Sequence, residues 1–264
     1  MADKQSGDGL ALLDRPEVSA VLFHPRREPS FFTSHGQAVS LPGADGQEIG
    51  GFLHTAGENA PTILFFHGNG EIAADYDELA QQYTKRGLNF LPVDYRGYGR
   101  SSGSPSVSSM LRDCHEIFAA AERLLTERGL TGPLLVMGRS LGSASALELA
   151  AAYPERVAGL IIESGFAFAA PLLRLMGLDM QTLGLAEEDA FDQLTKITAY
   201  TRPTLIIHAE LDQIIPFSDG ETLFQASPAR DKRFLPMPGA NHNDILFRDL
   251  ASYMKAVRNL ADTV

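Results

Sequence analysis

The chain has 264 residues, of which 44% are hydrophobic and 21% are charged, a composition typical of an ordinary globular protein. The 22 Lys and Arg residues against 33 Asp and Glu residues give a formal net charge of −11 at pH 7, which argues against DNA, RNA or an anionic lipid surface as a partner. Cys114 is the single cysteine, so the chain cannot form an internal disulfide or a thiolate-rich metal site.

The sequence predicts neither export nor a membrane anchor. Residues 1–10 are polar and acidic, and the apolar run of residues 10–13 is followed by Asp14-Arg15-Pro16 rather than by the small residues of a cleavage site. No stretch approaches the roughly 18–20 apolar residues that a transmembrane helix needs. We therefore expect a cytoplasmic protein without a stable membrane anchor.

The predicted strands begin with an antiparallel hairpin, in which residues 37–41 and 47–54 flank a turn at residues 42–46 that contains proline and glycine. Farther along, short apolar runs alternate with amphipathic stretches. Five runs are continuously apolar: residues 62–66, 89–93, 134–137, 157–162 and 204–207. Such runs are typical of strands covered on both faces, which predicts a mostly parallel sheet between layers of helices.

Three longer stretches carry apolar side chains at three- and four-residue spacing, the pattern of helices that pack one face on a core. They are residues 72–83, 110–125 and 246–260, and Gly87 is placed to end the first helix. The alternation of strands and helices predicts one doubly wound α/β domain over residues 1–264.

Residues 165–202 interrupt this alternation. The segment follows a predicted strand, is longer than a single crossover helix, is rich in apolar side chains and turns acidic at residues 187–189. We expect a short helical insertion above the carboxyl edge of the sheet, which is the place of a lid.

Residues 138–142, GRSLG, fit the pattern G-x-S-x-G between a predicted strand and an Ala-rich helical stretch. A nucleophilic serine on such a turn has a strained backbone, and glycines on either side let the strand and the helix approach closely. Ser140 would lie at the start of the helix, whose free N–H groups favour developing negative charge. Ser140 is therefore the candidate nucleophile.

Residues 67–70, HGNG, follow the strand of residues 62–66, where a serine hydrolase needs a loop that supplies an oxyanion donor. The backbone N–H groups of Asn69 and Leu141 are the candidate donors for a tetrahedral intermediate. The alternative interpretation is an ordinary turn in which Asn69 caps the next helix.

The acid and the base are expected after the serine, in that order. Asp212 follows the strand of residues 204–207, and His242 is the one histidine beyond Asp212. Histidine, with an ordinary pKa of about 6.5, can accept the serine proton at neutral pH while the carboxylate fixes its tautomer. Glu163, at the end of another predicted strand, is the rival acid.

The remaining histidines suggest other roles. His67 and His208 precede the proposed acid, which favours a structural role in bracing loops. No spacing resembles a zinc or facial-triad site, so we expect neither a metal nor another cofactor. Residues 97–103, GYGRSSG, lack the spacing of a phosphate-binding loop, and we expect them to line the edge of the site.

These motifs together resemble the α/β-hydrolase superfamily, in particular the Bem46-like and ABHD13/17-like serine hydrolases and the serine aminopeptidase S33 group. The resemblance implies Ser140 as nucleophile, Asp212 as acid, His242 as base, and Asn69 and Leu141 as oxyanion donors. It runs from about residue 45 to residue 260 and rests on these segments: residues 67–70, 93–103, 138–143, 160–166, 203–224 and 239–244.

Two features depart from that family. His208-Ala209 stands where the family commonly has His-Gly, and Glu210 adds a carboxylate close to Asp212. The Cys-rich N-terminal palmitoylation region of the mammalian depalmitoylases is absent, so the resemblance does not imply membrane targeting.

The sequence thus predicts a serine hydrolase that cleaves carboxylic esters or thioesters through an acyl-enzyme intermediate. The apolar insertion indicates a small-molecule substrate with an apolar acyl group. Two alternatives remain: an amidase or aminopeptidase-type hydrolase, and a non-catalytic ligand-binding protein of the same fold, since fold does not fix function.

Overall fold

The computed structural model describes residues 7–30, 32–186 and 190–264. The eight strands within these ranges form one sheet. The strand order is β1-β2-β4-β3-β5-β6-β7-β8; β1–β2 and β2–β4 are antiparallel and all other pairs are parallel. The strands are β1 (Gln37–Pro42), β2 (Glu48–Leu53), β3 (Thr62–Phe66), β4 (Asn89–Val93), β5 (Leu134–Arg139), β6 (Gly159–Glu163), β7 (Thr204–Ala209) and β8 (Lys232–Met237).

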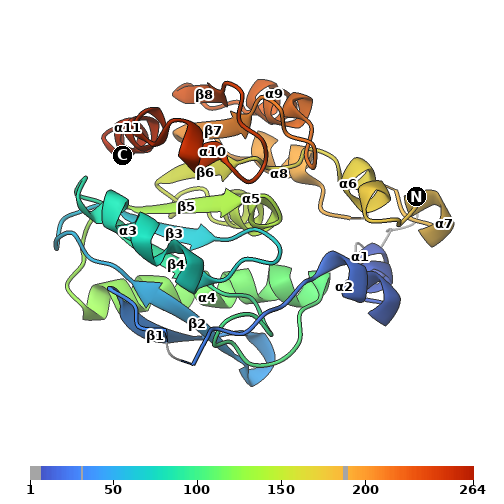
Figure 1. Cartoon of the computed structure of the whole chain (residues 1–264), viewed down its shortest axis with the longest axis horizontal. Helices are drawn as coiled ribbons and strands as arrows, with labels where there is room; N and C mark the ends of the chain where they lie inside the picture. Colours follow the sequence, from blue (N-terminus) through green and yellow to red (C-terminus); the bar gives the residue numbers. More distant parts are fainter. Residues whose placement is uncertain (1–6, 31, 187–189) are drawn as a thin grey trace.

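Helices cover both faces of this sheet (Figure 1). The helices are α1 (Gly7–Leu13), α2 (Pro16–Leu22), α3 (Asp77–Thr84), α4 (Val107–Glu127), α5 (Gly142–Ala152), α6 (Ala169–Leu175), α7 (Met180–Leu183), α8 (Gln193–Thr198), α9 (Phe217–Ala226), α10 (Ile245–Arg248) and α11 (Leu250–Ala261), with 3₁₀ turns η1 (Ala44–Gly46) and η2 (Ala73–Tyr76). Buried side chains of α3 and α11 pack on one face of the sheet, and those of α4, α5, α8 and α9 pack on the other.

The central strands divide their side chains between two cores. In β3, Ile63 and Phe65 join the core under α3 and α11, whereas Leu64 and Phe66 join the core under α4 and α5. All five β3 residues are buried, as the continuous apolar run predicts for a strand covered on both faces. The mostly parallel α/β sheet and the N-terminal antiparallel hairpin are therefore confirmed.

Two of the expected helices are interrupted. The stretch of residues 72–83 forms the 3₁₀ turn η2 followed by α3. The stretch of residues 246–260 forms α10 and α11, which are separated by Asp249 with an extended φ of −154°. Asp249 caps the start of α11, where its side chain accepts from the Ser252 backbone N–H, and this cap accounts for the break after α10. Asp75 caps the start of η2 by accepting from the Ile72 backbone N–H, whereas α3 begins without a side-chain cap.

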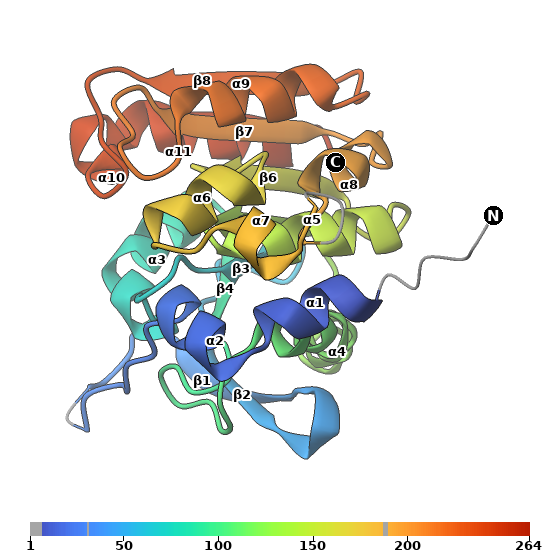
Figure 2. The ribbon, with the colours of Figure 1, turned by 90° about the vertical axis from the view of Figure 1, so that its right-hand side faces the viewer.

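The segment of residues 165–202 contains three short helices rather than one crossover. α6 and α7 lie beside the N-terminal pair α1–α2 in Figure 2, while α8 packs against α5 in the helix layer. The acidic residues 187–189 lie outside the described residues. The sequence analysis did not predict α1 and α2, which contribute Leu13, Val18 and Leu22 to the core under α4. None of the described helices combines the length and apolar character needed to span a bilayer.

Candidate active site

Ser140 lies on a sharp turn between β5 and α5, at the carboxyl edge of the sheet. Its φ is +52°, a left-handed conformation that is uncommon for any residue except glycine. The Ser140 backbone N–H donates to the Glu163 carbonyl at 2.9 Å, and the Ser143 hydroxyl donates to the Ser140 carbonyl at 2.7 Å. These two bonds hold the strained turn from both sides, so the structure has the local geometry that the motif predicts.

The glycines of the motif permit a close approach that a Cβ atom would block. A Cβ at Gly142 would lie 2.1 Å from the carbonyl oxygen of Phe66, the last residue of β3. A Cβ at Gly138 would lie 2.2 Å from the Gly142 carbonyl oxygen. Helix α5 therefore starts directly against β3 and β5 because both positions are glycine.

A hydrogen-bonded chain connects Ser140, His242 and Asp212. The Ser140 Oγ lies 3.0 Å from His242 Nε2, and His242 Nδ1 lies 2.7 Å from Asp212 Oδ2. The three side chains come from the loops after β5, β8 and β7, which meet at the carboxyl edge of the sheet. Ser140 and His242 are 9% and 6% exposed, so each is buried and reached through a small opening.

The Asp212 carboxylate is held in its charged form. Burial raises the pKa of Asp212, but the hydrogen bond and charge of His242 and the backbone N–H groups of Ile214 and Ile215 outweigh that effect, so the pKa lies below its ordinary value. The two backbone bonds are 2.9 and 2.8 Å long. Asp212 Oδ2 is therefore a fixed acceptor for the Nδ1–H of His242, which leaves Nε2 free to accept from Ser140.

Glu163, the rival acid, is engaged elsewhere. Its carboxylate accepts from Arg139 Nη1 at 3.0 Å and from the Tyr253 hydroxyl at 2.6 Å. The acid in hydrogen-bond contact with His242 is Asp212. Glu210 also points elsewhere, because its carboxylate accepts from the Gly239 backbone N–H at 3.0 Å.

Asn69 and Leu141 line the same cavity as Ser140 and His242. Within the described ranges, neither of these two backbone N–H groups donates a hydrogen bond. The Asn69 side chain fixes the loop: its amide donates to the Leu22 carbonyl at 2.7 Å, and its Oδ1 accepts from the Tyr98 hydroxyl at 2.8 Å and from the His24 N–H at 3.0 Å.

The cavity has a volume of about 320 Å³ and is lined by both polar and apolar side chains. Ser140, His242, Asn69 and Glu71 supply polar groups. The apolar lining residues are Leu22, Leu141, Leu172, Leu175, Met176, Phe191 and Ile214. A mixture of apolar walls and a few convergent polar groups is typical of small-molecule sites.

One side of this cavity was not predicted from the sequence. Leu22, the last residue of α2, and His24 just beyond it line this side, and Glu71 lines it from the loop after β3. A weak signal for α2 existed, since Pro16 stands at its first turn and Val18 and Leu22 are four residues apart. The loop of residues 97–103, expected to line the edge of the site, contributes no residue to the cavity wall and contacts the site only indirectly, through the hydrogen bond from Tyr98 to Asn69.

His67 and His208 brace loops on either side of the site. His67 Nδ1 donates to the Gly68 carbonyl at 2.8 Å, and His208 Nε2 donates to the Ile215 carbonyl at 3.0 Å. Burial lowers the pKa of His208, which keeps its imidazole neutral beside Asp212 at a distance of 3.7 Å.

Among the described residues, one group brings three potential metal ligands together: His35, Asp77 and Glu78. Asp77 already accepts from the Ser34 hydroxyl and from the His35 backbone N–H, and it forms an ion pair with the His35 ring. No member of the group lines the Ser140 cavity.

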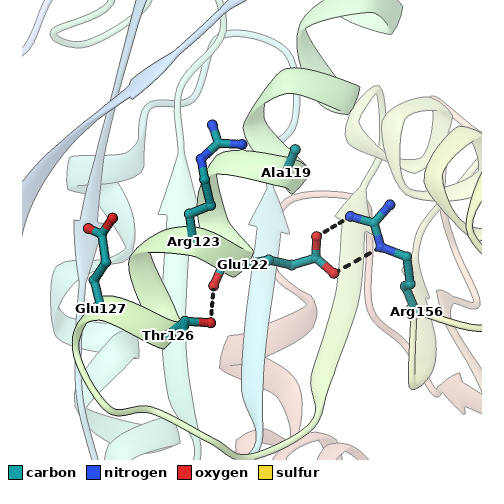
Figure 3. A pocket seen from close by; sticks show the side chains of 6 residues that line it. All are labelled: Ala119, Glu122, Arg123, Thr126, Glu127 and Arg156. Carbon is teal, nitrogen blue, oxygen red and sulfur yellow. Dashed lines mark hydrogen bonds and ion pairs between the residues drawn. The ribbon is translucent and has the colours of Figure 1, made fainter.

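Figure 3 shows a separate hollow on α4, lined by charged and small side chains. Glu122 of α4 forms a two-point ion pair with Arg156, and Thr126 donates to the Glu122 carbonyl at 2.9 Å. Of its two acids and two arginines, Glu122 and Arg156 are paired with each other, and the hollow shares no residue with the Ser140 cavity.

The sheet order and the loops gathered at its carboxyl edge define an α/β-hydrolase fold, and the chain belongs to the α/β-hydrolase family. Residues 57–186 match the family model described as serine aminopeptidase, S33. The chain is similar to alpha/beta hydrolase domain-containing protein 17C of Homo sapiens, with 33% identity over 199 residues that cover 74% of this chain and 56% of that protein. An uncharacterized protein of Mycobacterium tuberculosis is 32% identical over 229 residues, which cover 84% of this chain and 78% of the relative.

Solved structures share the fold at low sequence identity. An esterase from Pyrococcus furiosus superposes with a TM-score of 0.73 at 15% identity, covering 91% of this chain and 98% of that chain. A protein from Butyrivibrio proteoclasticus with ferulic acid bound superposes with a TM-score of 0.70 at 17% identity, covering 86% and 98% of the two chains.

We predict that Gly142→Ala destabilises the protein by about 1–3 kcal/mol, because the added methyl group must displace the Phe66 carbonyl or the start of α5. Urea unfolding measures the effect. The matched control is Gly57→Ala, at a glycine with no atom within 4 Å of the added Cβ, where the change should stay within about 0.5 kcal/mol. Equal stability of the two variants would contradict the close approach.

A second prediction concerns pH. The folded-state pKa of Asp212 lies below its unfolded value of about 3.9, so its contribution to stability is present above that pH and is lost as pH falls through the folded pKa. The unfolding free energy of wild type minus that of Asp212→Asn should be constant just above pH 5 and shrink toward pH 3. Urea titrations across this range measure it, and a difference that grows on acidification would refute the assignment.

Proposed function

We propose that the protein is a serine hydrolase that cleaves carboxylic esters or thioesters through a Ser140-bound acyl intermediate. The observation that carries this proposal is the hydrogen-bonded chain from Asp212 through His242 to Ser140, ending in a cavity with an apolar wall. Membership of the α/β-hydrolase family supports it, as does the fold shared with an esterase.

In the first half-reaction, His242 Nε2 accepts the Ser140 proton while Oγ attacks the substrate carbonyl carbon. Asp212 fixes the imidazole tautomer and stabilises the imidazolium that forms. The tetrahedral intermediate then collapses: the carbon–oxygen or carbon–sulfur bond breaks, and the Nε2 proton passes to the leaving alcohol or thiol. Water repeats these steps on the acyl-enzyme and releases the acid.

The negative charge of the intermediate needs donors beside Ser140. We assign this role to the backbone N–H groups of Asn69 and Leu141, because both residues line the cavity and neither N–H donates a hydrogen bond to another described residue. A preorganised donor of this kind contributes about 3–4 kcal/mol to lowering the barrier. The three hydrogen bonds of the Asn69 side chain keep its backbone in place, so little reorganisation is needed during the reaction.

The apolar lining of the cavity is suited to an acyl group. Leu172, Leu175 and Met176 of the α6 region contribute to it, together with Phe191 and Ile214. We assign α6 and α7 the role of a lid over the cavity. The buried side of α6 anchors it, and Leu175 is 58% exposed, which leaves one apolar side chain at the cavity edge.

A fluorophosphonate probe tests the nucleophile. We predict one label per chain, located on Ser140 by peptide mass spectrometry and absent from Ser140→Ala. Turnover of a simple ester should fall on the order of a million-fold in that variant. A folded wild-type protein that takes no label would instead favour a non-catalytic ligand-binding protein.

A series of p-nitrophenyl esters from acetate to palmitate tests the acyl site, with thioester and aminoacyl-anilide substrates alongside. We predict that kcat/KM rises with chain length while the methylenes enter the apolar wall, each buried methylene contributing about 0.8 kcal/mol. Leu175→Gln should reduce the preference for longer chains and leave acetate turnover unchanged. Leu211→Gln, at a leucine of similar exposure (57%) outside the cavity wall, is the control. Rates insensitive to chain length, or faster cleavage of the anilide, would contradict the assignment.

A further inference from the structure

Arg139, the residue before Ser140, carries a buried charge that the proposed reaction does not use. Its side chain is 7% exposed and lines a pocket next to the Ser140 cavity, which shares Glu71 and Asn243 with that cavity. A buried guanidinium is costly unless each of its donors finds an acceptor, so its contacts indicate what it does.

The guanidinium contacts three separate segments of the chain. Nε donates to Glu71 at 2.8 Å, in the loop after β3, and Nη1 donates to Glu163 at 3.0 Å, at the end of β6. Nη2 donates to the backbone carbonyl of His242 at 3.1 Å, and the Asn243 side-chain oxygen lies 3.5 Å away. Arg139 therefore contacts the loop that carries His242 through the backbone of that residue.

Glu71 extends the contact to the loop that carries Asn69. Its Oε2 accepts from the Gly68 backbone N–H at 2.7 Å and from the Tyr76 hydroxyl at 2.5 Å. Burial raises the pKa of Glu71, but the charge of Arg139 and the Tyr76 hydrogen bond outweigh it and hold the pKa below its ordinary value. Glu71 is thus a charged acceptor that clamps the turn on which Asn69 lies.

Glu163 connects Arg139 to the turn that carries Ser140. Its carboxylate binds Arg139 and Tyr253, while its backbone carbonyl accepts from the Ser140 N–H. The guanidinium thus joins the His242 loop, the Asn69 loop and the strand end that supports Ser140. Buried ion pairs add little net stability, and in some proteins they serve to specify one arrangement of the surrounding chain.

We propose that Arg139 is a positioning residue that holds the His242 and Asn69 loops at their working distances from Ser140. This inference rests on the proposed function, because it assigns those loops to the base and the oxyanion donor. Lysine at this position would keep the charge but has no planar fork, so it cannot bind Glu71, Glu163 and the His242 carbonyl together.

The test compares Arg139→Lys with the matched control Arg156→Lys, at an arginine that pairs with Glu122 outside the cavity. We expect kcat of Arg139→Lys with a p-nitrophenyl ester to fall about 10²-fold, the effect of a misplacement near 1 Å, while KM changes little. Fluorophosphonate labelling of Ser140 should slow in parallel. Both quantities should stay within twofold of wild type in Arg156→Lys.

Chemical rescue gives a second readout that loss of folding cannot mimic. In Arg139→Ala, added guanidinium ion should restore part of kcat, whereas in Arg156→Ala it should restore none. Urea unfolding gives the folded fraction of each variant, and all rates are expressed per folded molecule. Normal kcat in folded Arg139→Lys, or an effect confined to KM, would overturn the positioning role of Arg139. The proposed function would still stand in that case, provided that Ser140 of wild type is labelled. Wild type without label would instead remove the proposed function itself.

Discussion

The conformation of Ser140 constrains everything around it. A non-glycine residue with φ +52° on the turn between β5 and α5 is stable only because neighbouring residues leave room for it and supply hydrogen-bond partners. Gly142 lets α5 begin against the Phe66 carbonyl, and the Glu163 carbonyl accepts the Ser140 N–H. The parallel order of β3, β5 and β6 places those two groups on either side of the turn. The order of the strands therefore stabilises the strained backbone of Ser140, whose side chain lines the cavity.

A second layer of contacts surrounds that turn and is electrostatic. Asp212 and Glu163 are two buried carboxylates at the same sheet edge, with different partners: Asp212 faces the imidazole of His242, and Glu163 faces Arg139 and Tyr253. Because each carboxylate has its own hydrogen-bond partners, both acids can be buried at the same edge of the sheet. Asp212 interacts with a group that can change charge, whereas Glu163 is paired with a permanent cation. The two carboxylates are thus separated in role by their neighbours and not by their position in the sheet.

Much of the arrangement could be predicted from the sequence, because strands covered on both faces leave continuous apolar runs and the site residues follow those strands in a fixed order. Ser140, Asp212 and His242 are found in this way, and the structure brings them into contact. The N-terminal helices α1 and α2 could not be predicted in this way, since helices of seven residues depend on tertiary packing and leave only a weak local pattern in the sequence. The partners of Arg139 at Glu71, Glu163 and His242 are 68, 24 and 103 residues distant in the chain, so no local spacing could have indicated them.

Comparison of the two buried acids shows whether the hydrogen-bonded chain from Asp212 to Ser140 performs the hydrolysis. The measurement is kcat/KM of Asp212→Asn and Glu163→Gln on one ester, per folded molecule. We expect a loss of about 10⁴-fold for Asp212→Asn, through the wrong imidazole tautomer, and a much smaller loss for Glu163→Gln, whose amide oxygen can still accept from Arg139. Near-normal turnover of Asp212→Asn together with collapse of Glu163→Gln would contradict it.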